Sequence, residues 1–243
     1  MSKLEIPRKH LKVLQTQHPA FSLVEIAVVL VIVGLLIGAV LKGQDLLHNA
    51  RLNTIITQIN QYRLATTTFL DRYSALPGDY DMASKHIASH LKDGNSNGII
   101  QGPGAASYTS GENHQATSFW AHLAAADLIP DPGTKEQSGS ISPNHGFPAT
   151  KLGGGFTVSH APEKTMDGHW FIIGRQTGQN TKGGLFTPKD ALAIMQKIDT
   201  PDPFSGSVQV RNGIGSGQSE GCLKAKTLNI ENNQPACVLY IKM

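Results

Sequence analysis

The chain has 243 residues, of which 40% are hydrophobic and only 16% are charged. This length suits one domain of ordinary size with an appendage, and 25 Gly and 13 Pro indicate many turns without the bias of a disordered chain. The first 20 residues carry four basic side chains and one acidic side chain, so the whole net charge of +3 lies there and the remainder is neutral. Bulk charge therefore argues against nucleic-acid binding by the rest of the chain.

A continuous apolar segment follows this basic start. No residue from Ile26 to Leu41 is charged or strongly polar, and the block 21–41 is long enough for a helix across a bilayer core of roughly 30 Å. The apolar run is longer than that of a secretory signal peptide, and no convincing small-residue cleavage site follows it. We therefore expect a transmembrane helix over 21–41, with its basic flank in the cytoplasm because positive residues resist translocation. A buried core helix is the alternative.

Glu25 is the acidic residue inside this apolar block. A carboxylate in lipid costs about 2.5–3.5 kcal/mol on insertion scales, so it should have a partner. No Lys, Arg or His lies between Phe21 and Leu41, and the partner must therefore come from elsewhere. A new α-amino group, created by a cut shortly before Glu25, would serve.

The string from Pro19 to Ile26, PAFSLVEI, followed by the apolar run, resembles the cleavage and methylation motif of type IV pilins and of type II secretion pseudopilins. The resemblance implies that a prepilin peptidase cuts between Ala20 and Phe21 and methylates the new N-terminus. It also implies that Glu25 pairs with the N-terminal amine of a neighbouring subunit during assembly, since two charges buried in lipid are tolerable only together. The family usually has Gly where this chain has Ala20.

The resemblance sets an expected organisation: a cleaved basic leader over 1–20, a long helix over 21–75 that is transmembrane in 21–41, and an α+β head over 76–243. The implied partners are the prepilin peptidase, membrane lipid, an inner-membrane assembly platform, and copies of this chain and other pilins in a filament. The precursor would lie in the bacterial inner membrane with its head in the periplasm, and then enter a periplasmic or cell-surface filament. No enzymatic activity is expected. The choice between major pilin, minor pilin and pseudopilin stays open.

The pattern after Gly43 becomes amphipathic. Apolar and small residues recur at steps of three and four, which is typical of a helix with one buried face: Leu46, Leu47, Ala50, Ile55, Ile56, Ile59, Tyr62, Thr66, Phe69 and Tyr73. Because no proline lies between Ala20 and Leu76, one helix is expected from about Ser22 to Tyr73, ~75 Å long. Two helices joined at residues 42–43 are the alternative.

The remaining residues predict a small, loop-rich α+β head. Pro77 and Gly78 end the long helix. Further helices are expected near 80–91, over 117–128 with Thr117 as its cap, and over 188–198 with Thr187 as its cap and Pro188 in its first turn. Strands are expected at 156–159, 169–173, 207–211 and 236–242, bounded by Gly and Pro.

The two cysteines, Cys222 and Cys237, lie near the C-terminus. In a cytosolic protein they would be free thiols, whereas in a periplasmic protein they can pair. With the head in the periplasm, as the resemblance implies, a bridge would close a loop of about 15 residues and contribute about 3 kcal/mol in the chain-entropy model. It would staple the C-terminal strand, as in many type IV pilins.

Asp93, Asn95 and Asn97 offer side-chain oxygens at alternate positions of the string DGNSNG, like the first half of an EF-hand loop. The acidic residue that completes such a loop is missing, because the twelfth position is Gly104. Some pseudopilins bind calcium in their heads, so these three residues are candidate calcium ligands and calcium is the one candidate cofactor. An Asn- and Gly-rich turn is the alternative.

Two other functions compete with that of a filament subunit. A membrane-anchored periplasmic binding module or adhesin would use the helix only as an anchor. A membrane-tethered hydrolase would use Ser219, which stands in a GQSEG string that matches the nucleophile-elbow pattern but has no clear strand before it. His86 and His90 are four residues apart, but no HExxH motif accompanies them.

Overall fold

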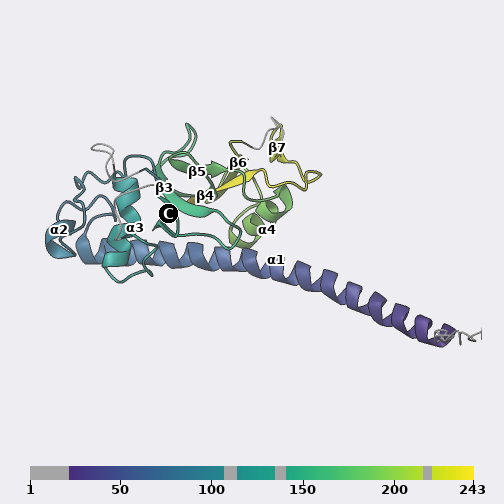
Figure 1. Ribbon diagram of the computed structural model, residues 1–243. Helices are drawn as coiled ribbons and strands as arrows, with labels where there is room; N and C mark the ends of the chain where they lie inside the picture. The colour runs from purple at the N-terminus through teal and green to yellow at the C-terminus, as the bar shows by residue number, and fades with distance from the viewer. Residues whose placement is uncertain (1–21, 107–113, 135–140, 216–220) are drawn as a thin grey trace, which may run out of the picture. The chain divides into compact units, whose positions relative to one another are not determined.

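The computed structural model describes residues 22–106, 114–134, 141–215 and 221–243 (Figure 1). The chain divides into two compact units, 1–47 and 48–243, which are described separately. The second unit is an α+β head that includes the last part of the N-terminal helix. The predicted class, α+β with a long N-terminal helix, is confirmed.

Helix α1 runs without a break from Leu23 to Tyr73, a length of 51 residues. It continues through residues 42–43, so the alternative of two joined helices is wrong. In the head, its buried residues follow the predicted three- and four-residue steps: Leu52, Ile55, Ile59, Tyr62, Ala65, Thr66 and Phe69. Leu46 and Leu47 were predicted on this stripe, but they are 71% and 62% exposed, so the buried stripe begins only at Leu52.

An antiparallel sheet forms the centre of the head. Its strands have the order β3 (Gly155–His160), β4 (His169–Thr177), β9 (Cys237–Lys242), β6 (Val208–Asn212), and β5 (Asn180–Gly183) also pairs with β4. The register pairs Ile173 with Leu239, and Leu239 with Val210. The last strand in the sequence therefore lies between two others, and the C-terminus is held inside the sheet.

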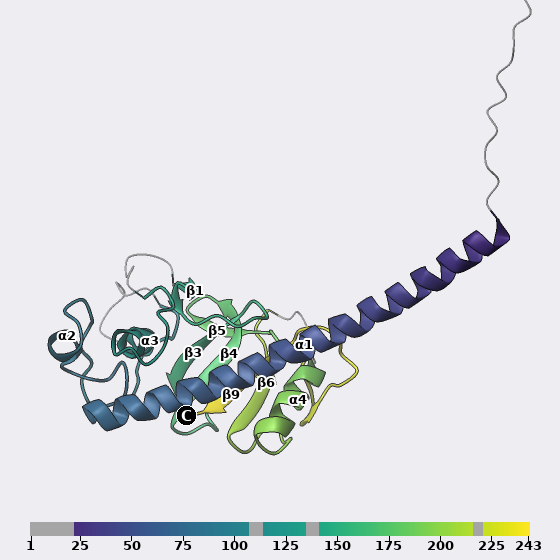
Figure 2. The ribbon, with the colours of Figure 1, turned by 90° about the horizontal axis from the view of Figure 1, so that it is seen from below.

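Side chains alternate between the two faces of this sheet, as the two-residue repeat of a strand requires. Phe171, Ile173, Leu239 and Ile241 belong to the large core that also contains α1, α3 (Gln115–Ala125) and α4 (Pro188–Ile198). In that core, the Tyr62 ring of α1 makes edge contacts with Trp120 and Phe156 at centroid distances of 5.0 and 5.1 Å. The opposite face carries a smaller cluster of Met166, Trp170, Ile172, Val238 and Tyr240. Figure 2 shows α1 crossing the sheet on the side of α3 and α4.

Each predicted helix of the head has a counterpart among the described residues, but not every boundary is correct. Helix α4 begins as predicted, with Thr187 and Asp190 forming a capping box and Pro188 at its first position. Thr117 is not the cap of α3, because His114 precedes the helix and Thr117 is buried inside it. The Thr117 hydroxyl donates to the carbonyl oxygens of Pro103 and Ala106, so its tertiary bonds replace the predicted capping role.

The helix expected near 80–91 is reduced to α2, Ala83–His86. Hydrogen bonds from the following loop explain this, because the Asp93 carboxylate accepts from both the backbone and the hydroxyl of Ser84.

Several short strands were not predicted, since two-residue pairings carry no alternating pattern: β1 (Ser142–Pro143), β2 (Gly146–Phe147), β7 (Leu223–Lys224) and β8 (Thr227–Leu228). The four-residue β5 was also missed.

Candidate functional site

The N-terminal turn of α1 carries the sequence motif. Ala20 and Phe21, the predicted processing site, lie outside the described residues. Ser22 directly precedes the helix, and its hydroxyl accepts a hydrogen bond from the Val24 N–H at 3.3 Å. Ser22 therefore caps the helix, which begins two residues after the predicted processing site.

Glu25 lies in the first turn of α1, where the positive end of the helix dipole favours an acidic side chain. It is exposed, and the residues on either side of it, Val24 and Ile26, are exposed apolar side chains. Among the residues that the structure describes, Glu25 has no ion-pair partner. The geometry thus leaves this carboxylate available to a group from outside the described chain.

The apolar part of α1 is a candidate membrane span. Within the described residues, α1 is the single helix long and apolar enough to cross a bilayer, and none of its most apolar window is buried. Its exposed side chains from Leu23 to Leu41 are Leu, Ile, Val, Ala and Gly apart from Glu25. A soluble protein rarely exposes so large an apolar surface, so a membrane or another protein is needed to cover it.

The head is attached to α1 through polar contacts that sequence reasoning missed. His48 Nε2 lies 2.7 Å from Asp190 Oδ1, and the same Asp190 carboxylate closes the capping box at the start of α4. Near the end of the sheet, Arg63 donates two hydrogen bonds to the carbonyl oxygen of Lys242 at 3.0 and 2.6 Å. The string TPKD predicted the cap, but no sequence signal pointed to His48 as its partner.

Cys222 and Cys237 form a disulfide across 15 residues of sequence, and both are fully buried. The side-chain oxygen of Asn212 accepts from the N–H groups of Cys222 and Leu223 at 2.9 and 2.8 Å, which anchors the same loop to β6. The bridge therefore fastens the loop before β9 to the start of that central strand, as expected for a C-terminal staple.

The candidate calcium residues each have another hydrogen-bond partner. Asp93 accepts from Ser84, Asn95 Oδ1 accepts from Gln115 Nε2 at 2.8 Å, and Asn97 Oδ1 accepts from the Ile99 N–H at 2.9 Å. Within the described ranges, no group of three or more His, Cys, Asp or Glu side chains is arranged to hold a metal ion. Calcium binding by Asp93, Asn95 and Asn97 stays a prediction.

The residue that organises this loop is Asp79, which is not among the predicted site residues. It is 1% exposed, and its carboxylate accepts from the N–H of Gly98 at 2.8 Å, the N–H of Asn97 at 3.3 Å and Gln115 Nε2 at 3.0 Å. The available sequence signal was an acidic residue directly after the helix-ending Pro77-Gly78 pair. The loop DGNSNG is thus wrapped around an internal carboxylate.

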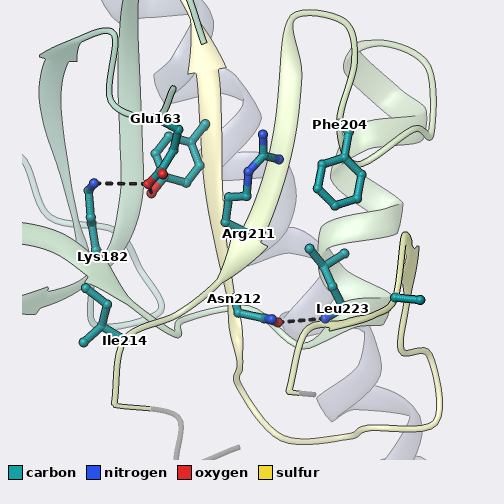
Figure 3. Close-up of a pocket in the computed structure, with 9 residues that line it drawn as sticks. Glu163, Lys182, Phe204, Arg211, Asn212, Ile214 and Leu223 are labelled. Atoms are coloured by element: carbon teal, nitrogen blue, oxygen red, sulfur yellow. Dashed lines mark hydrogen bonds and ion pairs between the residues drawn. The ribbon is translucent and has the colours of Figure 1, made fainter. Parts of the chain in front are cut away.

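A shallow hollow of about 570 Å³ lies on the sheet face opposite α1, lined by Glu163, Lys182, Phe204, Arg211, Tyr240 and neighbouring residues (Figure 3). The charged side chains of this hollow are held by ion pairs and hydrogen bonds to other residues of the protein. Lys182 pairs with Glu163 at 3.2 Å, and Arg211 donates to the carbonyl oxygens of Pro203 and Val210. The Arg211 guanidinium also lies 4.7 Å from the centre of the Phe204 ring. These contacts fix the loops over the smaller core.

The enzymatic rival depends on Ser219. Ser219 lies outside the described residues, and the His86 ring bonds to the Tyr80 hydroxyl.

In comparisons with known proteins, no family model, no curated protein and no solved structure matches this chain.

Proposed function

We propose that this chain is the precursor of a filament subunit of the type IV pilin and type II pseudopilin class. A prepilin peptidase hydrolyses the peptide bond between Ala20 and Phe21, which leaves a carboxylate on Ala20 and a new amine on Phe21. The amine is then methylated, and the subunit moves from the inner membrane into a filament through α1. In this proposal the chain is the peptidase's substrate and a building block of the filament.

The observation that supports this proposal most strongly is the placement of Glu25. Its carboxylate lies in the first turn of a helix whose surrounding side chains are exposed and apolar, and no ion-pair partner is described for it. In lipid, an unpaired carboxylate costs several kcal/mol, whereas pairing with a second buried charge offsets much of that cost. The new amine of a neighbouring subunit supplies this second charge and sets the register of assembly.

The experiment is a comparison of Glu25→Ala with Asp45→Asn, which changes an acidic residue on the same helix beyond the apolar run. Both variants are expressed in cells that have a prepilin peptidase and the assembly machinery, and the chain is measured in the sheared filament fraction. We expect Glu25→Ala to be processed but absent from filaments, and Asp45→Asn to assemble normally. Normal assembly of Glu25→Ala would contradict the role proposed for Glu25, whereas absence of the unchanged chain from the filament fraction would favour a membrane-anchored binding module or adhesin.

A further inference from the structure

One side of the head carries a groove between α1 and the turn that follows α3. The groove has a volume of about 500 Å³ and is lined by Gln58, Gln61, Tyr62, Leu64, Ala65, Thr68 and residues 127–130. Asp127 is the charged residue in this lining, and Leu64 stands at its edge with 68% of its surface exposed. Apart from Asp127, this lining is uncharged and partly apolar, as the buried centre of an interface usually is.

Removing water from the helix surface beside the groove also costs little free energy. No exposed residue of α1 between Arg51 and Asp71 carries a charge, and Arg63 is half-buried on the Lys242 carbonyl. The hydroxyls of Thr57, Thr67 and Thr68 each donate to the carbonyl oxygen four residues earlier. By contrast, α4 exposes Lys189 and Lys197, the ordinary charged face of a surface helix.

The rim of the groove is acidic. Asp71 lies seven residues after Leu64 and therefore on the same face of the helix, and exposed Asp127 belongs to the adjoining turn. Among the described residues of this rim, Arg72 is the cation, and it donates to the Ala126 carbonyl oxygen. In this part of the chain, the exposed carboxylates of Asp71 and Asp127 therefore outnumber it. We call the lining together with Asp71 and Asp127 the acidic groove.

The loop that the disulfide closes exposes basic side chains together with an apolar one. The β7–β8 hairpin exposes Lys224 and Lys226, and Ile230 beyond it is 52% exposed. Among the described residues, neither lysine has an ion-pair partner, and the acidic Glu231 follows the hairpin. Residues 223–230 are here called the basic hairpin. Helix α3 and β7 lie toward opposite ends of the head (Figure 1).

We propose that the acidic groove of one copy of this chain receives the basic hairpin of the next copy in the filament. This inference rests on the proposed function. The two surfaces are complementary in charge, and Ile230 offers an exposed apolar side chain to the groove beside Leu64. Because the complementary surfaces lie at different places on one molecule, their contact repeats head to tail and builds an open filament instead of a closed dimer.

The test is a charge exchange in the full-length chain. The hairpin variant carries Lys224→Glu and Lys226→Glu, and the groove variant carries Asp71→Lys and Asp127→Asn. Asn is chosen at position 127 because the Asp127 backbone has a φ of 57°, which Asn tolerates. Lys151→Glu, in an exposed turn, is the matched control. The amount of chain in the sheared filament fraction is measured, with N-terminal mass analysis to confirm processing.

We expect each charge variant to lower filament incorporation by about tenfold, since like charges placed across an interface are costly, and the combined variant to restore most of it. Lys151→Glu should assemble like the unchanged chain. Normal assembly of both charge variants would overturn the inference. Losses without recovery in the combined variant would also overturn it, because the two surfaces would then face something other than each other. If the unchanged chain is itself processed but never found in filaments, the proposed function fails instead.

Discussion

The imidazole of His122 holds the turn that ends helix α1. Its Nδ1 accepts the N–H of Gly78 at 2.9 Å, and its Nε2 lies 2.8 Å from the carbonyl oxygen of Lys92. Because a backbone N–H can only donate, Nδ1 carries the lone pair and Nε2 carries the proton. The ring is fully buried and neutral, and it joins α3 to two separate loop segments.

This arrangement predicts a head that loses stability in mild acid. Burial lowers the pKa of His122 to about 4, with the nearby Asp93 carboxylate opposing that shift and His114 adding to it. Since the unfolded chain binds the proton near pH 6.5, stability is complete above that pH and falls as the pH drops toward 4. The free energy of unfolding should decrease by up to about 3 kcal/mol across this window.

The measurement is urea unfolding of the detergent-solubilised full-length protein at a series of pH values. His122→Asn should have a lower free energy of unfolding at neutral pH. Between pH 6.5 and 4, its free energy of unfolding should fall much less than that of the unchanged protein. His90→Asn, at an exposed position, is the control and should show the full decrease. An unchanged pH dependence in His122→Asn would show that other groups cause it.

The buried carboxylate of Asp79 predicts a second stability effect. Asp79→Ala removes the acceptor of the Gly98 N–H and one of the two acceptors of the Asn97 N–H and of the Gln115 amide, whose other acceptor is Asn95 Oδ1. Loss of the acceptor of a buried donor costs about 1–3 kcal/mol. We expect a loss of at least this size in the unfolding free energy, measured by urea titration. Asp81→Ala removes an exposed neighbouring carboxylate and should change it by less than about 0.5 kcal/mol. Equal effects of the two substitutions would contradict the role of Asp79.

The disulfide should contribute to stability through the loop that it closes. Replacing Cys222 and Cys237 together by Ala opens a loop of 15 residues and should lower the unfolding free energy by about 3 kcal/mol. Reductant should weaken the unchanged protein to a similar degree and have no effect on the double variant. A double variant as stable as the oxidised protein would show that hydrogen bonds such as those of Asn212 hold this loop without the bridge.

The elements with strong local signals were predictable from the sequence. The helix from Leu23 to Tyr73 follows from an apolar run, a three- and four-residue repeat and a stop at Pro77. The start of α4 follows from the string TPKD, because its cap forms between residues only three apart. The strands at 155–160, 169–177, 208–212 and 237–242 follow from short apolar runs bounded by turns.

What the sequence did not reveal depends on contacts between distant residues. His48 and Asp190 are 142 residues apart, and nothing local marks them as partners. The insertion of β9 between β4 and β6 likewise depends on long-range pairing. The side-chain oxygens of the string DGNSNG predicted calcium ligands. The string instead folds around the carboxylate of Asp79, some 15 residues earlier. Local sequence patterns do not predict contacts between residues so far apart in the sequence.

The central claim is that the chain is a processed filament subunit, and N-terminal mass analysis of the protein from its native membrane tests it most directly. The account predicts a mature chain that begins at N-methylated Phe21 and retains Glu25 as its fifth residue. A chain that still begins at Met1, in cells with an active prepilin peptidase, would contradict it and would leave α1 as a simple membrane anchor.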